Sequence, residues 1–372
     1  MKILLGVTGS VAATLTPKMV KALSAIGEVA VVCTENSKYF FNPSELGVPV
    51  YSDRDEWYDA NGEKIWKKKG DPVRHIDLRK EYGVLVVAPL SANTAAKFAN
   101  GIADNLLTSL FLAWDNVKTR VAAPSMNTLM FENPKTRLNL MSVGQYAIIV
   151  PPISKVLACN EEGVGAMALI DDIVARVKTV TRWVFPLEDV CPGIPVGVHP
   201  GAFGAQRRRS FHTGVDLYCP EGSVVRAVES GRVVGVERFT GESVGSPWWN
   251  ETDALLIEGS SGVVCYGEIK VSDDISVGDV VFDGGKVGHV VPVVKEGRER
   301  PDVPGHSRSM LHLELYCNGR TSVSSHWGLD SEKHDYMLDP TKMILESENC
   351  PPVSFDMPSW PDEIAKVREN VG

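Results

Sequence analysis

The chain has 372 residues, more than one domain usually contains, so its length favours two domains. It carries 38 Lys and Arg residues against 47 Asp and Glu residues, and the net charge of −9 argues against nucleic acid or an anionic membrane as its partner. No apolar run reaches membrane-spanning length, and the N-terminal residues 1–10 fit a first β-strand better than a signal peptide.

Strands and helices alternate along the first half of the chain. An apolar strand pattern at residues 2–8 leads into a helical pattern at about residues 12–26, and a later helix is indicated where Ile170, Ile173 and Val177 recur at helical spacing. We therefore predict an α/β domain with a doubly wound parallel sheet of the flavodoxin or Rossmann type. The further predicted strands are residues 28–33, 84–88, 120–123 and 145–150.

The ends of the first two predicted strands offer groups that suit a phosphate. Gly9 and Ser10 form a turn before a helix start, where backbone N–H groups bind anions. Thr34 and Ser37 follow the second strand, at the same edge of the predicted sheet. Each hydroxyl could complete a phosphate site or cap a helix, and the residues alone leave both interpretations open.

Small polar loops also follow the next two strands. The third strand breaks at Pro89 into a loop at residues 91–94, and the fourth breaks at Pro124 into a loop that contains Asn127. Hydroxyl groups suit a phosphate, and the Asn127 amide both donates and accepts hydrogen bonds. Because ligands of open parallel sheets lie beyond the carboxyl ends of the strands, these loops predict a cleft for an anion or a nucleotide.

Two reactive side chains in the first half each have a structural and a functional interpretation. His75 follows a polar, Trp-bearing region at residues 51–72 that could fold over a ligand, yet a lone histidine is more often structural. Cys159 lies between Ala158 and a Gly-rich acidic turn, unlike a packed core position, although a lone Cys is usually a buried hydrophobe. The seven scattered cysteines are typical of reduced thiols, so we expect a cytoplasmic protein.

Three motifs make residues 1–184 resemble the flavin-containing cysteine decarboxylases, specifically the eukaryotic phosphopantothenoylcysteine decarboxylases. PLSANT at residues 89–94 resembles the family's flavin loop, and PSMNTLMF at residues 124–131 resembles its substrate loop. GDPVRHIDLR at residues 70–79 resembles the segment that carries its essential histidine. The resemblance implies FMN as cofactor and decarboxylation of 4′-phosphopantothenoylcysteine to 4′-phosphopantetheine in coenzyme A synthesis. It also implies a homo-oligomer, a trimer or a multiple of trimers, with flavin at subunit interfaces.

The resemblance also implies roles for individual residues. His75 would be the base, Asn127 would hold the substrate carboxylate, and Cys159 would be the acid of the final reduction. The implied flavin contacts are Gly9, Ser10, Val11, Thr34, Ser37, Ser91, Ala92, Asn93, Thr94, Ala123 and Met126. The implied substrate contacts are Asn127, Lys155, Ala158 and Met167.

Two other functions share part of this pattern. A peptide cysteine decarboxylase of the lanthipeptide type would share the first half-reaction, but such enzymes stop at the enethiol and lack the Cys159 loop. A non-enzymatic regulator, like the fungal paralogues that bind a phosphatase, would typically lose one catalytic residue or carry a long acidic tail. This chain keeps His75, Asn127 and Cys159 and has a short mixed tail, so a decarboxylase with a small-molecule substrate is the favoured interpretation.

The pattern changes in the second half of the chain. After the decarboxylase-like domain at residues 1–185, residues 186–205 are rich in Pro and Gly and predict a linker. Residues 206–345 contain short Val-rich strands between Gly turns, which predicts an all-β domain. Residues 346–372 are rich in Pro, Ser and acidic residues, and we expect an arm that lies on a surface.

The second half also contains three residues that could bind a metal. His212 and Asp216 form an HxxxD pattern, and His312 lies in a distant predicted strand. Three such ligands could hold a tetrahedral Zn²⁺ with one position open. Residues 209–338 resemble the lysostaphin-type zinc peptidases in FHTGVDL and LHLELY, which assigns the three ligands residue by residue.

Two residues of the second half depart from that peptidase pattern. Met310 and Glu268 stand where the family has the two histidines that handle protons and the oxyanion. A Glu could act as a base, so an active peptidase stays open as an alternative. Loss of catalytic groups typically costs orders of magnitude in rate, so we favour a zinc-binding or scaffolding module.

Overall fold

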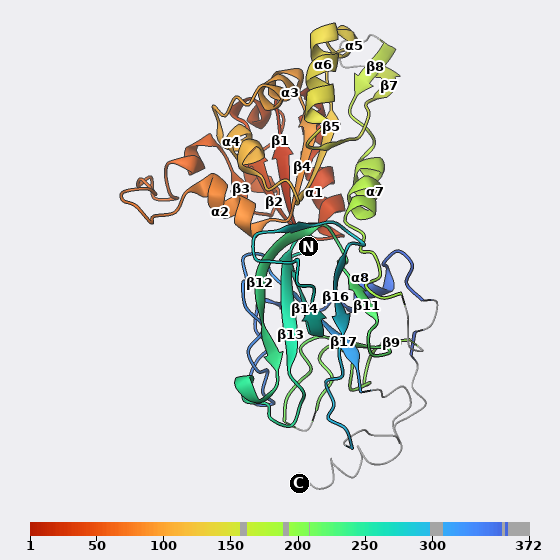
Figure 1. Cartoon of the computed structure of the whole chain (residues 1–372). Coiled ribbons are helices and arrows are strands. Elements are labelled where there is room, and N and C mark those ends of the chain that lie inside the picture. The colour runs from red at the N-terminus through yellow and green to blue at the C-terminus, as the bar shows by residue number, and fades with distance from the viewer. Residues whose placement is uncertain (157–161, 189–192, 208, 298–307, 352–353, 356–372) are drawn as a thin grey trace. The chain divides into compact units, whose positions relative to one another are not determined.

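The computed structural model describes residues 1–156, 162–188, 193–207, 209–297, 308–351 and 354–355 (Figure 1). The chain divides into two compact units. The first contains Met1–Arg182 with Glu258–Gly262, and the second contains Trp183–Ile257 with Val263–Gly372. Among the described residues, no helix has both the length and the apolar character needed to span a membrane.

The first unit is built on a six-stranded parallel sheet with the order β3-β2-β1-β4-β5-β6. Without the two-residue edge strand β3, this is the flavodoxin order, and the connections change direction between β1 and β4. The predicted doubly wound parallel sheet is confirmed. The strands are β1 (Lys2–Val7), β2 (Glu28–Cys33), β3 (Val50–Tyr51), β4 (Val84–Leu90), β5 (Thr119–Pro124) and β6 (Ile148–Ile149).

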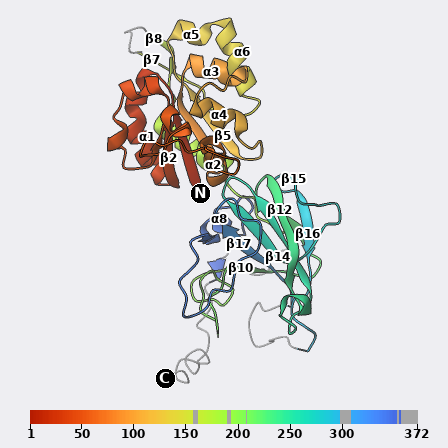
Figure 2. The ribbon, with the colours of Figure 1, turned by 90° about the vertical axis from the view of Figure 1, so that its left-hand side faces the viewer.

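Helices cover both faces of this sheet (Figures 1 and 2). Because successive strand residues point to opposite faces, Leu5 packs with the α1 and α7 side chains, whereas Leu4 packs with the opposite helical layer. Ile173 and Val177 are fully buried, as the helical spacing predicted. The helices are α1 (Thr16–Ser24), α2 (Arg74–Glu81), α3 (Ala92–Ala99), α4 (Leu106–Ala113), α5 (Thr128–Glu132), α6 (Pro134–Val143) and α7 (Ile170–Val180).

Short elements complete the first unit around the carboxyl ends of the strands. The hairpin of β7 (Ile153–Val156) and β8 (Glu162–Ala166) follows the last strand of the sheet. Four 3₁₀ helices lie among the described residues of this unit. They are η1 (Val11–Leu15), η2 (Glu35–Tyr39), η3 (Pro43–Glu45) and η4 (Asp53–Glu56).

The second unit is mostly antiparallel β-structure, as the change of sequence pattern predicted. Its main sheet has the order β10-β17-β14-β13-β12-β15, and β11, β16 and β18 pair at its sides. Tyr266 of β14 and Leu311 of β17 lie in its core and are fully buried. The strands are β9 (Ile194–Pro195), β10 (Val215–Tyr218), β11 (Val224–Arg226), β12 (Gly231–Thr240), β13 (Thr252–Glu258), β14 (Val263–Val271), β15 (Val280–Val281), β16 (Lys286–Val290), β17 (Met310–Tyr316), β18 (Met337–Leu338) and β19 (Ser354–Phe355), with η5 (Glu242–Val244) and α8 (Thr341–Leu345) as short helices.

The sequence analysis predicted a linker at residues 186–205, and several described residues of this segment lie in a hydrophobic core. Leu187 and Ile194 belong to the hydrophobic core of the second unit, and Ala202 is also buried. Gly204 has φ +70, so at least one of the glycines serves a tight turn. The described residues of this segment therefore pack with the second unit.

Candidate functional site

A cavity of about 970 Å³ lies in the first unit at the carboxyl ends of β1, β4 and β5. This is the edge at which the strand order of an open α/β sheet places its ligand. The volume is at the upper end of the range of ligand pockets. The lining includes Gly9, Ser10, Val11, Thr34, Asn36, Asp53, Ser91, Ala92, Asn93, Thr94, Ser125, Met126, Asn127, Lys155 and Met167.

The turn after β1 brings the backbone close to the cavity. A Cβ on Gly9 would lie 2.9 Å from the Cβ of Asn36, so only glycine fits there without a shift of the backbone. Ser10 caps η1, because its Oγ accepts a hydrogen bond from the backbone N–H of Ala12 at 3.4 Å. The same hydroxyl donates to the Oγ of Ser125 at 3.1 Å, which joins the β1 turn to the loop after β5.

The buried residue Thr8, which directly follows β1, holds the loop after β4 in place. The Oγ1 of Thr8 donates to the carbonyl of Pro89 at 2.7 Å and accepts from the backbone N–H of Ser91 at 2.8 Å. Ser91 in turn caps α3 by accepting from the N–H of Thr94 at 3.3 Å. The polar loop predicted from the sequence is therefore a rigid helix start whose side chains line the cavity.

The loop after β5 is packed against the β8 strand. The N–H of Met126 donates to the carbonyl of Gly165 at 2.9 Å, and a Cβ on Gly165 would lie 2.2 Å from the carbonyl oxygen of Met126. Asn127 caps α5 by accepting from the N–H of Leu129 at 2.9 Å through its Oδ1. Because an amide oxygen only accepts, the Nδ2 group is the part of the Asn127 side chain that can donate a hydrogen bond to an acidic ligand.

His75 lies on α2 and does not line the cavity. Its Nδ1 is 2.5 Å from the Oε1 of Glu56, a carboxylate that is 8% exposed. A carboxylate only accepts, so the Nδ1 of the ring carries a hydrogen, and in the neutral tautomer with that hydrogen the Nε2 has a lone pair. A histidine oriented by a buried carboxylate is chemically suited to accept a proton, but within one chain it stands apart from the predicted flavin residues.

Most other predicted site residues meet at the cavity, with two exceptions. Ser37 is fully buried and donates to the carbonyl of Thr34 at 2.6 Å, so its hydroxyl is used inside η2. Ala123 is fully buried in the core of the sheet, where an alternating strand position turns its side chain inward. Ala158 and Cys159 lie outside the described residues. Sequence reasoning missed Asn36 and Asp53, which follow β2 and β3 at the same sheet edge.

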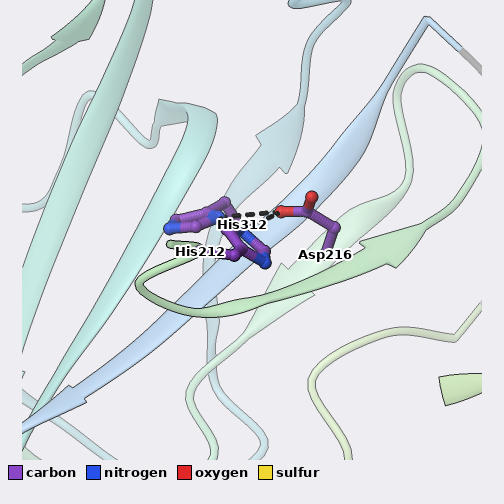
Figure 3. Close-up of side chains that lie close together, drawn as sticks. All are labelled: His212, Asp216 and His312. Carbon is purple, nitrogen blue, oxygen red and sulfur yellow. Dashed lines mark hydrogen bonds and ion pairs between the residues drawn. The ribbon is translucent and has the colours of Figure 1, made fainter. Parts of the chain in front are cut away.

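In the second unit, the side chains of His212, Asp216 and His312 lie close together (Figure 3). Asp216 on β10 and His312 on β17 are direct partners in the antiparallel register, and His212 lies four residues before Asp216. The Nε2 of His212 lies 3.1 Å from both the Nδ1 of His312 and the Oδ1 of Asp216, and the last two atoms are 2.8 Å apart. All three residues are at most 5% exposed.

The outer atoms of this triad are also held. His212 donates from Nδ1 to the carbonyl of Ala202 at 3.0 Å, and Arg207 donates to the Oδ2 of Asp216 at 2.6 Å. The Nε2 of His312 lies 3.0 Å from the Oε1 of Glu314. Since both outer partners of the histidines are acceptors, the two inner nitrogens and the inner carboxylate oxygen direct lone pairs at one point. Such a point requires a cation, either a proton or a metal ion.

The dimensions of the triad fit a zinc ion. Zn–N and Zn–O bonds of about 2.0–2.2 Å in a tetrahedron separate neighbouring ligand atoms by roughly 3.3 Å. The three inner atoms are only slightly closer, at 2.8–3.1 Å. In the absence of a metal, burial would lower the pKa of His312, but its hydrogen bonds to Asp216 and Glu314 outweigh burial and raise that pKa to about 10. The site therefore holds a proton at neutral pH when no metal is bound.

Met310 and Glu268 differ in what they can contribute beside the triad. Met310 is 8% exposed and packs with Tyr218 and Val293, so it supplies no group that can transfer a proton. Glu268 has φ +63, and its Oε2 is buried with no hydrogen-bond partner among the described residues. Burial and the charge of Asp216 raise the pKa of Glu268 to about 8.

Comparisons with known proteins concern the first unit. A family model described as Flavoprotein matches residues 1–182. The phosphopantothenoylcysteine decarboxylase of Mus musculus is 46% identical over 182 residues, which are 48% of this chain and 86% of that protein. The enzyme of the same name from Arabidopsis thaliana is 45% identical over 180 residues, 48% of this chain and 83% of that protein. A solved structure of a PPC decarboxylase variant complexed with pantothenoylaminoethenethiol is 42% identical, covers 48% of this chain and 96% of that chain, and has a TM-score of 0.45.

The parallel sheet and the cavity at its strand ends define an α/β protein with a flavodoxin-like fold. Through residues 1–182, the chain belongs to the flavoprotein family.

Proposed function

We propose that the first unit is an FMN-dependent phosphopantothenoylcysteine decarboxylase, which converts 4′-phosphopantothenoylcysteine to 4′-phosphopantetheine in coenzyme A synthesis. One observation carries this proposal. Loops from the ends of β1, β4 and β5 bring residues of the flavin-loop and substrate-loop motifs to one cavity, and the chain that does so is 46% identical to the mouse decarboxylase over 182 residues. Neither the cavity nor the identity alone would assign the substrate.

The residues around the cavity fit FMN and a substrate together. The Gly9 turn allows backbone N–H groups to approach a phosphate closely, and the Ser10 and Ser91 hydroxyls lie beside it. When bound, FMN would oxidise the substrate's cysteine thiol to a thioaldehyde, an electron acceptor that permits loss of CO₂, and would return the electrons to the resulting enethiol. The protein's part is to bind, orient and move protons.

Three residues of this chain have the chemistry for these tasks, two to move protons and one to orient the substrate. The Nε2 of His75 accepts a proton in the first step, because Glu56 holds the proton of the ring on Nδ1. The Nδ2 group of Asn127 donates to the substrate carboxylate and orients it. Cys159 donates the proton of the final reduction; this role comes from the sequence pattern, since the residue lies outside the described part.

The position of His75 supports an oligomer. In one chain His75 does not line the cavity, so we propose a homo-oligomer, a trimer or a multiple of trimers, in which His75 of one protomer reaches the cavity of another. Apolar side chains at the surface of α5 and α6 are consistent with a protein interface. Leu129, Leu138 and Met141 are 73%, 59% and 70% exposed.

The visible absorption spectrum of the purified full-length protein tests the class, and CO₂ release from 4′-phosphopantothenoylcysteine tests the substrate. We expect a yellow protein that releases FMN on denaturation and turns over the substrate completely. A yellow protein that acts only on peptides with a C-terminal cysteine would be a peptide decarboxylase. A colourless protein that does not bind added FMN would be a non-enzymatic relative. Light scattering tests the oligomer.

For the second unit, we propose a zinc-binding module with a lysostaphin-type fold that does not hydrolyse peptides. The triad dimensions and the outer partner of each ligand support the metal, while Met310 in place of a histidine argues against catalysis. Metal analysis of protein purified without a nickel column should find one zinc equivalent that is lost in His312→Ala. A metal-free wild-type protein, or peptide cleavage that depends on Glu268, would contradict the proposal.

A further inference from the structure

Glu314 of β17 is a buried carboxylate two residues beyond His312. Residues i and i+2 of a strand lie on the same face, so the two side chains are neighbours. The Oε1 of Glu314 is 3.0 Å from the Nε2 of His312, and Glu314 is 1% exposed. A carboxylate this deeply buried is costly unless its partners are well placed. The lysostaphin-type pattern of three ligands does not by itself assign a function to this residue.

The carboxylate of Glu314 is held in place by its own contacts. Ser324 donates from Oγ to Oε1 at 3.1 Å, and the hydroxyl of Tyr316 donates to Oε2. The Tyr316 oxygen itself accepts from the backbone N–H of Ser324 at 2.9 Å. Gly214 closes the remaining side, since a Cβ there would lie 2.8 Å from the Cγ of Glu314. The carboxylate therefore cannot turn away from His312 without disturbing several contacts.

This arrangement determines which nitrogen of His312 faces Asp216. Because Oε1 of Glu314 can only accept, the Nε2 of His312 carries hydrogen. The neutral ring then directs the lone pair of Nδ1 toward Asp216 and His212, the geometry a metal ligand needs. If the ring rotated or took the other tautomer, an N–H group would point into the centre and oppose a cation.

We propose that Glu314 is a positioning residue that holds His312 with its Nδ1 toward Asp216 and His212 and thereby sets the zinc affinity of the second unit. This inference rests on the metal-binding function proposed above. Outer partners of metal-bound histidines typically contribute 10- to 100-fold to metal affinity.

Metal titration of the full-length protein tests this proposal. Glu314→Gln keeps the size of the side chain but removes its charge and one acceptor, and we expect zinc affinity to fall about 10- to 100-fold. Glu296→Gln is the matched control, since it makes the same chemical change at an exposed glutamate outside the contacts of Glu314; its zinc affinity should stay close to that of the wild type. Melting temperatures in chelator show whether each variant is folded. If Glu314→Gln does not fold, Glu314→Asp takes its place. This variant keeps the negative charge but moves the carboxylate oxygen away from the Nε2 of His312.

A second measurement reads the protonation and metal binding of the two His312 nitrogens directly. Nitrogen-15 NMR of zinc-loaded wild-type protein should show His312 with hydrogen on Nε2 and metal on Nδ1, and Glu314→Gln should broaden or shift the Nε2–H signal. The opposite tautomer in the wild type, or wild-type zinc affinity in a folded Glu314→Gln, would overturn the inference while leaving the metal site intact. Wild-type protein that binds no zinc would instead overturn the metal function, and the role of Glu314 with it.

Discussion

The Nδ1 atom of His75 lies 2.5 Å from the Oε1 atom of Glu56, a buried carboxylate whose second oxygen has no hydrogen-bond partner among the described residues. The pair joins η4 to the start of α2, although 19 residues separate the two side chains. A base oriented by a carboxylate is a recurring arrangement in enzymes that abstract protons. The sequence motif identified the histidine but not its partner.

Glu56→Gln should therefore lower kcat for decarboxylation by about 10- to 100-fold with FMN content unchanged. The neutral amide orients His75 less firmly and stabilises the protonated ring less. Steady-state CO₂ release measures the loss, and Glu63→Gln, at an exposed residue that pairs with Lys67, is the control. Because the pair acts as a unit, adding Glu56→Gln to His75→Asn should cost little more than His75→Asn alone. Additive losses would contradict a shared role.

Cys159→Ser should separate the two half-reactions. We expect one release of CO₂ per flavin, followed by a reduced flavin and an accumulating enethiol, because a serine hydroxyl is a far weaker acid than a thiol. Stopped-flow absorbance and mass spectrometry of the product measure both. Normal turnover by the serine variant would show that another group supplies the final proton.

Gly165→Ala should disturb the loop at residues 124–127. A Cβ would lie 2.2 Å from the Met126 carbonyl oxygen, and the φ of +152 is unfavourable for alanine, so we expect a loss of about 1–3 kcal/mol in stability and weaker flavin binding. Gly101→Ala is the matched control, with φ +67 but nothing within 4 Å. Its cost should be about 1 kcal/mol, with normal FMN content. Equal FMN content in both variants would argue against a packed role for Gly165.

The raised pKa of Glu268 predicts a pH dependence for the metal-free second unit. A carboxyl group with a pKa of about 8 when folded and 4.5 when unfolded binds more protons in the folded state between those values. The free energy of unfolding should therefore fall as pH rises from about 4.5 to 8. Glu268→Gln should remove that part of the slope, worth about 1–3 kcal/mol, less than the full shift because the side chain is partly exposed. Melting curves in chelator measure it, with exposed Glu296→Gln as control; identical slopes would refute the assignment.

A chain that ends at Arg182 should bind FMN and decarboxylate within about tenfold of the full-length rate, a barrier change of roughly 1.4 kcal/mol, provided it assembles. The reason is that every residue assigned to the cavity belongs to the first unit. Kinetics, FMN content and light scattering of the truncated protein check this. A loss of more than about a hundredfold, with FMN content and oligomeric size unchanged, would show that the second unit contributes to the chemistry.

The fold class and many of the candidate site residues could be inferred from local patterns in the sequence alone. Apolar periods are local properties, so strands such as residues 84–88 and the helix with Ile173 and Val177 could be read without coordinates. Strand ends of a parallel sheet meet at one edge, which is why Ser10, Ser91 and Asn127 could be expected at one cavity.

Contacts that depend on strand register, side-chain direction and packing could be identified only in the folded protein. Ser37 follows the right strand, but its hydroxyl bonds within η2, and Ala123 points into the core. The partnership of Glu56 with His75 depends on how η4 packs beside α2, which no local pattern encodes. Glu314 shares the LHLELY motif with His312, yet its role became visible only when the antiparallel register placed Asp216 on one side of the ring and the carboxylate on the other.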